Sequence, residues 1–169
     1  SGNMSGGCKG SGGIIDRDCY GNTISANVIA HNGGGVDLRD AHGWTVSANT
    51  LTIMKTHAVR VGPGSGRITI TGNNFSNSYI GEGGIKRRKN DEAAAGLTLE
   101  GTRDVTVSGN LFSSVRPKAI ALNGQPSQHV LFGDNVLVDV PSDHAKIKTT
   151  GTLLVAPATT PTSSTPLHP

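Results

Sequence analysis

The sequence predicts an all-β fold, a right-handed parallel β-helix solenoid of about five to six coils. Three observations predict this architecture: a recurring asparagine phrase, an apolar phrase that follows it, and a high glycine content. Glycine accounts for 24 of the 169 residues, about twice its usual share. A fold with several tight turns in every coil needs such a composition, because glycine adopts turn conformations at low cost.

The asparagine phrase sets the period of the chain. It runs apolar residue, small or polar residue, small residue, asparagine, as in Ile24-Ser-Ala-Asn27, and its asparagines are 24, 22, 24, 37 and 25 residues apart. One such repeat cannot bury its apolar side alone, so the repeats are expected to stack. Stacked asparagine amides can then hydrogen-bond to one another inside the turns. The asparagines are Asn3, Asn27, Asn49, Asn73, Asn110 and Asn135.

The second phrase alternates apolar and variable residues, which is the period of a β-strand. It occurs at residues 35–38, 58–61, 96–99 and 119–122. Residues between two core positions of a strand point outward. Stacking these strands predicts two core ladders, one of Val36, Val59, Leu97 and Ile120 and one of Leu38, Val61, Leu99 and Leu122.

The turn phrase, as in Asn27-Val-Ile29 and Asn73-Asn-Phe75, resembles that of the parallel β-helix repeat proteins of the pectate-lyase-like superfamily. The resemblance covers about residues 1–148. It implies a carbohydrate-active protein that is secreted, periplasmic or displayed on the cell surface. It also implies calcium as a possible cofactor, although no acidic cluster in the sequence is typical of a calcium loop. The residues themselves indicate no cofactor and no metal site.

The domain organisation follows from where the repeats stop. Residues 1–155 are predicted to form the β-helix, with an insert loop at 78–95, and residues 156–169 a Pro/Thr/Ser-rich tail. The first phrase begins at Ser1, in mid-coil, so we expect a truncated N-terminal end that an upstream part of the same protein or a capping partner covers; an irregular cap is the alternative. Cys8 and Cys19 allow either a disulfide across a turn or two half-buried thiols.

The insert loop carries a basic run that includes Lys86, Arg87 and Arg88 and supplies much of the net charge of +3. Such a loop can attract the acid groups of a polysaccharide. Alternatively it is a solvated loop whose charge Asp91 and Glu92 partly offset. Nucleic acid is not expected as a partner, because the rest of the chain is not strongly basic. No apolar run is long enough to predict a membrane span.

Outward positions around the second phrase supply the candidate chemistry. Lysis of a uronate polysaccharide needs a cation beside the substrate carboxylate and a base for the C5 proton. Hydrolysis instead needs two carboxyl groups, which Asp37 or Asp18 could supply together with Asp40. The catalytic candidates are Asp37, Arg39, Asp40, His57 and Arg60, and the substrate-binding candidates are His42, Lys86, Arg87, Arg88 and Lys118.

The stacked Arg17-Asp18 and Arg39-Asp40 pairs have a structural alternative, because exposed ion pairs are common and contribute little. The sequence therefore predicts the C-terminal region of an exported carbohydrate-active β-helix protein that acts on an acidic polysaccharide as a lyase, an epimerase or a glycosidase. The alternative is a noncatalytic glycan-binding, adhesion or fibre-like module. An enzyme predicts a groove, walled by the 78–95 loop, and a spacer predicts a flat face instead. The groove would lie over Asp37, Arg39, Arg60 and His57.

Overall fold

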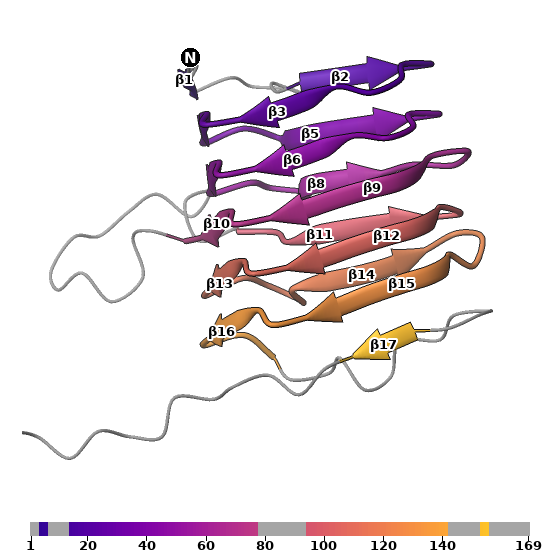
Figure 1. Cartoon of the computed structure of the whole chain (residues 1–169). Coiled ribbons are helices and arrows are strands. Elements are labelled where there is room, and N and C mark those ends of the chain that lie inside the picture. The colour runs from indigo at the N-terminus through magenta and orange to yellow at the C-terminus, as the bar shows by residue number, and fades with distance from the viewer. Residues whose placement is uncertain (1–3, 7–13, 78–93, 142–152, 156–169) are drawn as a thin grey trace, which may run out of the picture.

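The computed structural model describes residues 4–6, 14–77, 94–141 and 153–155. In these residues there is no helix, and 17 strands form three sheets in which every pairing is parallel. The strands stack into a solenoid whose axis runs from the first coil to the last (Figure 1). The all-β parallel solenoid that the repeat period predicts is therefore confirmed.

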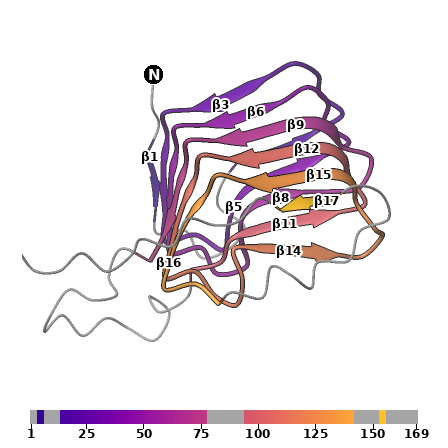
Figure 2. The same cartoon turned by 60° about the horizontal axis from the view of Figure 1, so that its bottom comes forward.

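The chain visits the three sheets in a fixed order in each coil, and Figure 2 shows the sheets around the common axis. Sheet A contains β1 (Met4–Gly6), β4 (Val28–Ala30), β7 (Thr50–Thr52), β10 (Asn74–Ser76), β13 (Leu111–Ser113) and β16 (Val136–Val138). Sheet B contains β2 (Ile14–Arg17), β5 (Gly34–Arg39), β8 (His57–Val61), β11 (Leu97–Glu100) and β14 (Ile120–Asn123). Sheet C contains β3 (Thr23–Ser25), β6 (Thr45–Ser47), β9 (Gly66–Thr71), β12 (Arg103–Ser108), β15 (Gln128–Gly133) and β17 (Leu153–Val155).

The core consists of apolar ladders that run parallel to the axis. The two ladders predicted for sheet B are confirmed: Val36, Val59, Leu97 and Ile120 are paired in register and buried, as are Leu38, Val61 and Leu99, with Leu122 partly buried. Sheet A adds a ladder in which the rings of Phe75 and Phe112 stack with their centroids 4.9 Å apart. Because each apolar residue is covered by its counterparts in neighbouring coils, no single coil could be stable alone.

The asparagine ladder forms as predicted at the corner between sheets C and A. Its described members, Asn27 to Asn135, are buried. The Oδ1 atom of Asn73, for example, accepts hydrogen bonds from the backbone N–H and the Nδ2 group of Asn49, both at 3.0 Å. The Nδ2 group of Asn73 also donates to the carbonyl of Val46 at 2.9 Å. These amides therefore satisfy backbone groups that the turn would otherwise leave without partners.

Left-handed backbone conformations make the corners of each coil sharp. The residue before each described ladder asparagine has a φ between 53° and 65°. These residues are Ala26, Ala48, Gly72, Gly109 and Asp134. Glycine adopts this conformation freely, whereas alanine does so at a cost. The corner geometry is therefore imposed by the stacking and not only by the local sequence.

Several predicted segments lie outside the described residues. They are Asn3, Cys8, most of the insert loop (residues 78–93) and the tail at 156–169. Cys19 is half-buried and packs against the core, and its carbonyl accepts a hydrogen bond from Nε1 of Trp44 at 3.1 Å. Trp44 itself is buried, so this ring belongs to the core and not to the surface.

Candidate functional site

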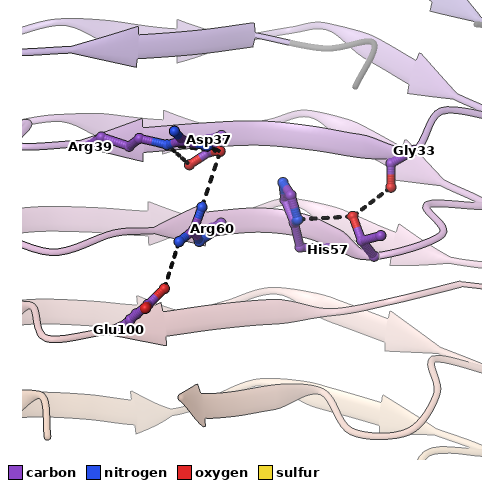
Figure 3. Close-up of polar contacts among 7 residues, drawn as sticks. Gly33, Asp37, Arg39, His57, Arg60 and Glu100 are labelled. Carbon is purple, nitrogen blue, oxygen red and sulfur yellow. Dashed lines mark hydrogen bonds and ion pairs between the residues drawn. The ribbon is translucent and has the colours of Figure 1, made fainter. Parts of the chain in front are cut away.

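The outer face of sheet B carries the predicted charged residues. Strands β5, β8 and β11 lie side by side, and their register places Asp37 opposite Arg60 and Arg60 opposite Thr98. The outward row predicted from the strand period is therefore present. Figure 3 shows the polar contacts on this face.

Four side chains form one continuous charged chain across three coils. The guanidinium of Arg39 donates to both carboxylate oxygens of Asp37, with Nη2 to Oδ2 at 2.5 Å and Nε to each oxygen at 3.2 Å. The Nη1 atom of Arg60 lies 3.4 Å from the same Oδ2 atom. The Nη2 atom of Arg60 donates to Oε2 of Glu100 at 2.6 Å. We call these residues the Asp37 network; their formal charges sum to zero.

Asp37 remains ionised because its arginine partners outweigh its burial. Its side chain is only 7% exposed, and burial by itself would raise the pKa of this carboxyl group. The hydrogen bond from Arg39 and the positive charges of Arg39 and Arg60 together hold the pKa of Asp37 below its usual value. The carboxylate in turn raises the pKa of Arg39. Asp37 is therefore a fixed negative group that holds two guanidinium groups, and not a proton donor near neutral pH.

His57 begins strand β8 and lies over a glycine of the preceding coil. It is paired with Gly34, and a Cβ atom at Gly34 would lie 2.6 Å from Nε2 of His57 and 2.7 Å from Cε1. Because any side chain at position 34 would meet the ring, glycine is required there for His57 to adopt this position. The imidazole itself therefore occupies the space over Gly34.

The hydroxyl group of Thr56 fixes the tautomer of His57. This hydroxyl donates its single proton to the carbonyl of Gly33 at 2.7 Å, and it lies 3.0 Å from Nδ1 of His57 (Figure 3). A hydroxyl that has given away its proton can only accept from the imidazole. We therefore assign the proton to Nδ1, which leaves a lone pair on Nε2.

The environment of His57 favours the neutral ring. Burial lowers the pKa of His57, and the positive charges of Arg60 and Arg39 lower it further, whereas Asp37 opposes the shift. The result is a pKa below the usual value for histidine. At neutral pH the ring is therefore neutral, and its Nε2 atom has the character of a base.

Asp40 and His42 lie apart from the Asp37 network. Both come after the end of β5, at the corner between sheets B and C, where Nε2 of His42 lies 3.4 Å from Oδ1 of Asp40. The ring of His42 also stacks on Tyr20, with ring centroids 5.3 Å apart. The catalytic candidates therefore divide into two groups: Asp37, Arg39, Arg60 and His57 on the face, and Asp40 at the corner.

Of the remaining candidates, Lys118 alone is among the described residues. Lys118 is half-buried and precedes β14, two coils after the position of His57. Lys86, Arg87 and Arg88 lie outside the described residues. The predicted stacking of Arg-Asp pairs is confirmed in the backbone, because Arg17 pairs with Arg39 in adjacent strands.

Two contacts were missing from the sequence-based site. Glu100 was not among the candidate residues, although it follows Leu99 at an outward position of β11 and completes the Asp37 network by pairing with Arg60. Thr56 was not recognised, and no pattern in the sequence marks a hydroxyl that bridges two coils. The strand period could have identified Glu100, but only the structure identifies Thr56.

The described residues contain no group of three or more His, Cys, Asp or Glu side chains that could hold a metal ion. The carboxylates of Asp37 and Glu100 are each held by an arginine. This arrangement does not fit a calcium site, because calcium needs several oxygen ligands without competing cations.

A cavity of about 310 Å³ lies at the corner between sheets B and C, beside the face that carries the Asp37 network. The groove predicted for an enzyme was expected over the face itself. The cavity runs across three successive turns and is lined by Gly64, Ser65, Gly101, Thr102, Arg103, Pro126 and Gln128.

Comparison with known proteins supports the fold. Residues 3–137 match the family described as "Right handed beta helix region", so the chain belongs to this family and the predicted handedness is confirmed. No protein of curated function matches the sequence. A solved structure of trypsin-treated QnrB1, a plasmid-mediated fluoroquinolone resistance protein, aligns with 90% of this chain and 92% of its own at 9% identity and a TM-score of 0.19. A similarity this low supports no inference about the fold or the function.

In the part of the chain that the structure describes, no helix is long and apolar enough to cross a membrane.

Proposed function

We propose that the protein acts on an acidic polysaccharide outside the cytoplasm and removes a proton from a uronate residue, as a lyase or an epimerase does. The observation that carries this proposal is the oriented, neutral imidazole of His57 beside Arg60 and Arg39. Proton abstraction next to a carboxylate needs a base and a nearby cation. The outer face of sheet B offers both kinds of group.

The arginines retain donors for a substrate carboxylate. Arg39 uses Nε and Nη2 for Asp37, and within the described residues its Nη1 group has no partner. Its side chain is 38% exposed, so this group can be reached from solvent. A guanidinium carries five N–H donors in a fixed plane. Arg39 could therefore bind a second carboxylate without releasing Asp37.

Proton abstraction fits this face better than glycoside hydrolysis. Hydrolysis needs one carboxylic acid that stays protonated near the working pH, which requires a raised pKa. The arginine partners of Asp37 and Asp139 instead lower the pKa of both carboxyl groups. The candidate pair of Asp37 and Asp40 is also separated, because Asp37 is bound to arginine and Asp40 lies at the corner with His42.

The test is incubation of the full chain with galacturonan, alginate and glucuronan in heavy water. An epimerase returns a solvent deuteron to C5, so incorporation of deuterium there reports epimerisation. A lyase expels the group on C4 and forms a double bond between C4 and C5, so absorbance of the unsaturated product reports elimination. His57→Gln should lower the rate of whichever reaction is observed by at least about 100-fold, which is the usual contribution of a general base.

The matched control is His129→Gln. His129 is exposed on sheet C and its Nδ1 atom lies 2.9 Å from Oδ1 of Asp104, so it is also a histidine with a polar partner. This variant should retain the rate of the unaltered protein. Equal rates in the unaltered protein and His57→Gln would rule out His57 as the base. Neither deuterium incorporation nor unsaturated product with any of the three polymers would contradict the proposed activity.

A second candidate function is a noncatalytic glycan-binding module. It is favoured by the balance of charge in the Asp37 network, where Asp37 and Glu100 already neutralise both arginines. Such a face would bind polysaccharide without turning it over. Binding of one of the three polymers with neither deuterium incorporation nor unsaturated product would support this function over the first.

A further inference from the structure

The corner between sheets B and C carries a row of side chains that the proposed chemistry does not use. Successive bridges and strand pairings align Tyr20 with His42, His42 with Gly66, Gly66 with Arg103, and Arg103 with Gln128. We call these residues the corner row. Adjacent parallel strands are about 4.8 Å apart, so the row extends over roughly 19 Å along the axis. This length suits a ligand with a linear repeat.

The floor of the adjoining cavity is held rigidly. Ser65 is 1% exposed and Thr102 2% exposed. The Oγ atom of Ser65 accepts the N–H of Ala41 at 3.1 Å, and the hydroxyl of Thr102 donates to the carbonyl of Ser65 at 2.7 Å. Because its polar atoms are engaged within the protein, the floor is a preformed surface that a ligand need not rearrange.

The walls of the cavity, in contrast, present unused polar groups. Arg103 and Gln128 are exposed, and their side chains make no hydrogen bond or ion pair in the described part of the chain. The aliphatic part of Arg103 lies across Gly66, where a Cβ atom would be 3.1 Å from Cγ of Arg103. The missing side chain at Gly66 thus lets Arg103 extend along the row toward His42.

The other end of the row is aromatic. Tyr20 is 68% exposed and its ring is nearly parallel to that of His42, with an angle of 15° between the planes. Stacked rings of this kind offer a flat apolar surface with polar edges. A sugar ring has an apolar face and polar edges as well. The row therefore combines a stacking surface, a cation and a carboxamide.

We propose that the corner row and its cavity bind a segment of an acidic polysaccharide, with the carboxylate of one uronate residue on Arg103. Gln128 then hydrogen-bonds a hydroxyl group of the same residue, and Tyr20 packs against a neighbouring sugar ring. This inference rests on the proposed function for the class of ligand, and it adds a second contact region one corner away from His57. Arg103 acts here as a binding residue and not as a catalytic one.

The charge of the corner favours a carboxylate over a phosphate or a sulfate cluster. Among the described residues that line the cavity, Arg103 is the one cation. A single guanidinium matches one planar carboxylate with two parallel hydrogen bonds. Asp40, whose Oδ1 atom would lie 2.9 Å from a Cβ atom at Gly64, adds negative charge at the same corner. A more highly charged anion would meet this repulsion with too few cations to offset it.

The test is a titration of the full isotope-labelled chain with short galacturonate and alginate oligosaccharides, observed by NMR. The Nε–Hε resonance of Arg103 and the carboxamide resonances of Gln128 should shift. Arg103→Gln should weaken binding by about tenfold or more, the usual effect of losing a charge-assisted pair. Arg67→Gln, which removes an exposed arginine of the neighbouring coil, should leave the affinity unchanged.

The outcomes separate this proposal from the proposed function. Shifts confined to sheet B, with unchanged affinity in Arg103→Gln, overturn the corner site and leave the chemistry at His57 standing. Corner shifts in a chain that shows neither C5 exchange nor unsaturated product support the corner site and contradict the enzymatic function. Equal weakening by Arg103→Gln and Arg67→Gln shows only general attraction to positive charge and overturns the site. No shift with either oligosaccharide overturns both proposals.

Discussion

At the scale of single residues, His57 owes its properties to one residue of the preceding coil and to two neighbours close in sequence. Gly34 provides room for the ring, Thr56 sets the position of its proton, and Arg60 disfavours its charge. The strand period placed Asp37 beside Arg60 because alternation fixes which residues point outward. It could not place the proton of His57, because that depends on side-chain rotamers and on a hydroxyl group in the preceding turn.

The lowered pKa of His57 predicts a specific dependence of stability on pH. An unfolded histidine titrates near about 6.5, above the folded pKa of His57. Between these two values the unfolded chain binds more protons than the folded chain. The contribution of His57 to the free energy of unfolding is therefore fully present above about pH 6.5 and is lost as the pH falls through the folded pKa. Urea unfolding at about pH 7.5 and about pH 5 should show this loss. Asp37 contributes to the loss only at lower pH, because its usual range lies near about 4.

The variant His57→Gln should lose less stability over this interval than the unaltered chain, because it lacks the titrating ring. His129→Gln keeps His57 and should behave like the unaltered chain. Should all three proteins lose the same amount, the environment of His57 does not disfavour its charge in solution.

At the scale of the elements, the turns between sheets C and A are held by asparagine amides. The side-chain amide of Asn73 makes hydrogen bonds to Asn49 and Asn110. It also donates hydrogen bonds to the carbonyls of Val46 and Thr71. The following residue, Asn74, differs sharply, because its buried Oδ1 atom has no hydrogen-bond partner among the residues that the structure describes. Two adjacent asparagines therefore contribute very differently to the same turn.

Asn73→Ala should lower the free energy of unfolding by about 3 kcal/mol, because it leaves the N–H of Asn49 and the carbonyl of Val46 buried without partners. Asn74→Ala should change it by less than about 0.5 kcal/mol, because no hydrogen bond is lost. Urea unfolding of both variants measures the difference. Similar losses in the two variants would mean that the ladder does not stabilise the turn.

The turns also contain backbone conformations that the sequence could not predict. The asparagine phrase identified the corner, because it recurs with fixed neighbours. The left-handed residues at other corners include His31 and Ile53, with φ values of 58° each. Isoleucine rarely adopts this conformation, so no local preference could have predicted it. Stacking on the neighbouring coils imposes the geometry there.

At the scale of the whole molecule, each coil is paired only with the coils before and after it. The sequence predicted this architecture well, because a repeat period constrains every coil at once. It did not predict that the cavity would lie at the corner between sheets B and C. The cavity depends on glycines at Gly64 and Gly101, whose positions relative to Arg103 follow from the register of the turns.

Nearest-neighbour stacking predicts graded local stability. Opening an interior coil breaks two interfaces, whereas opening a terminal coil breaks one. Amide hydrogens of β6 and β8 should therefore exchange with solvent more slowly than those of β3 and β16, which are at or near the ends of their sheets among the described strands. Native-state hydrogen exchange measures this order. Uniform exchange in all four strands would indicate that the solenoid opens as one unit.

The hydrogen-bond geometry of the asparagine ladder does not depend on the length of chain between its members. Asn73 and Asn110 are 37 residues apart, yet the Nδ2–Oδ1 bond between them is 3.0 Å, the same as the bond between Asn49 and Asn73 over 24 residues. Asn77 and Ala95 rejoin the coils through backbone bonds to Ser113 and Met54. A foreign peptide inserted between Asn77 and Ala95 should therefore leave the described coils on both sides in the same frame.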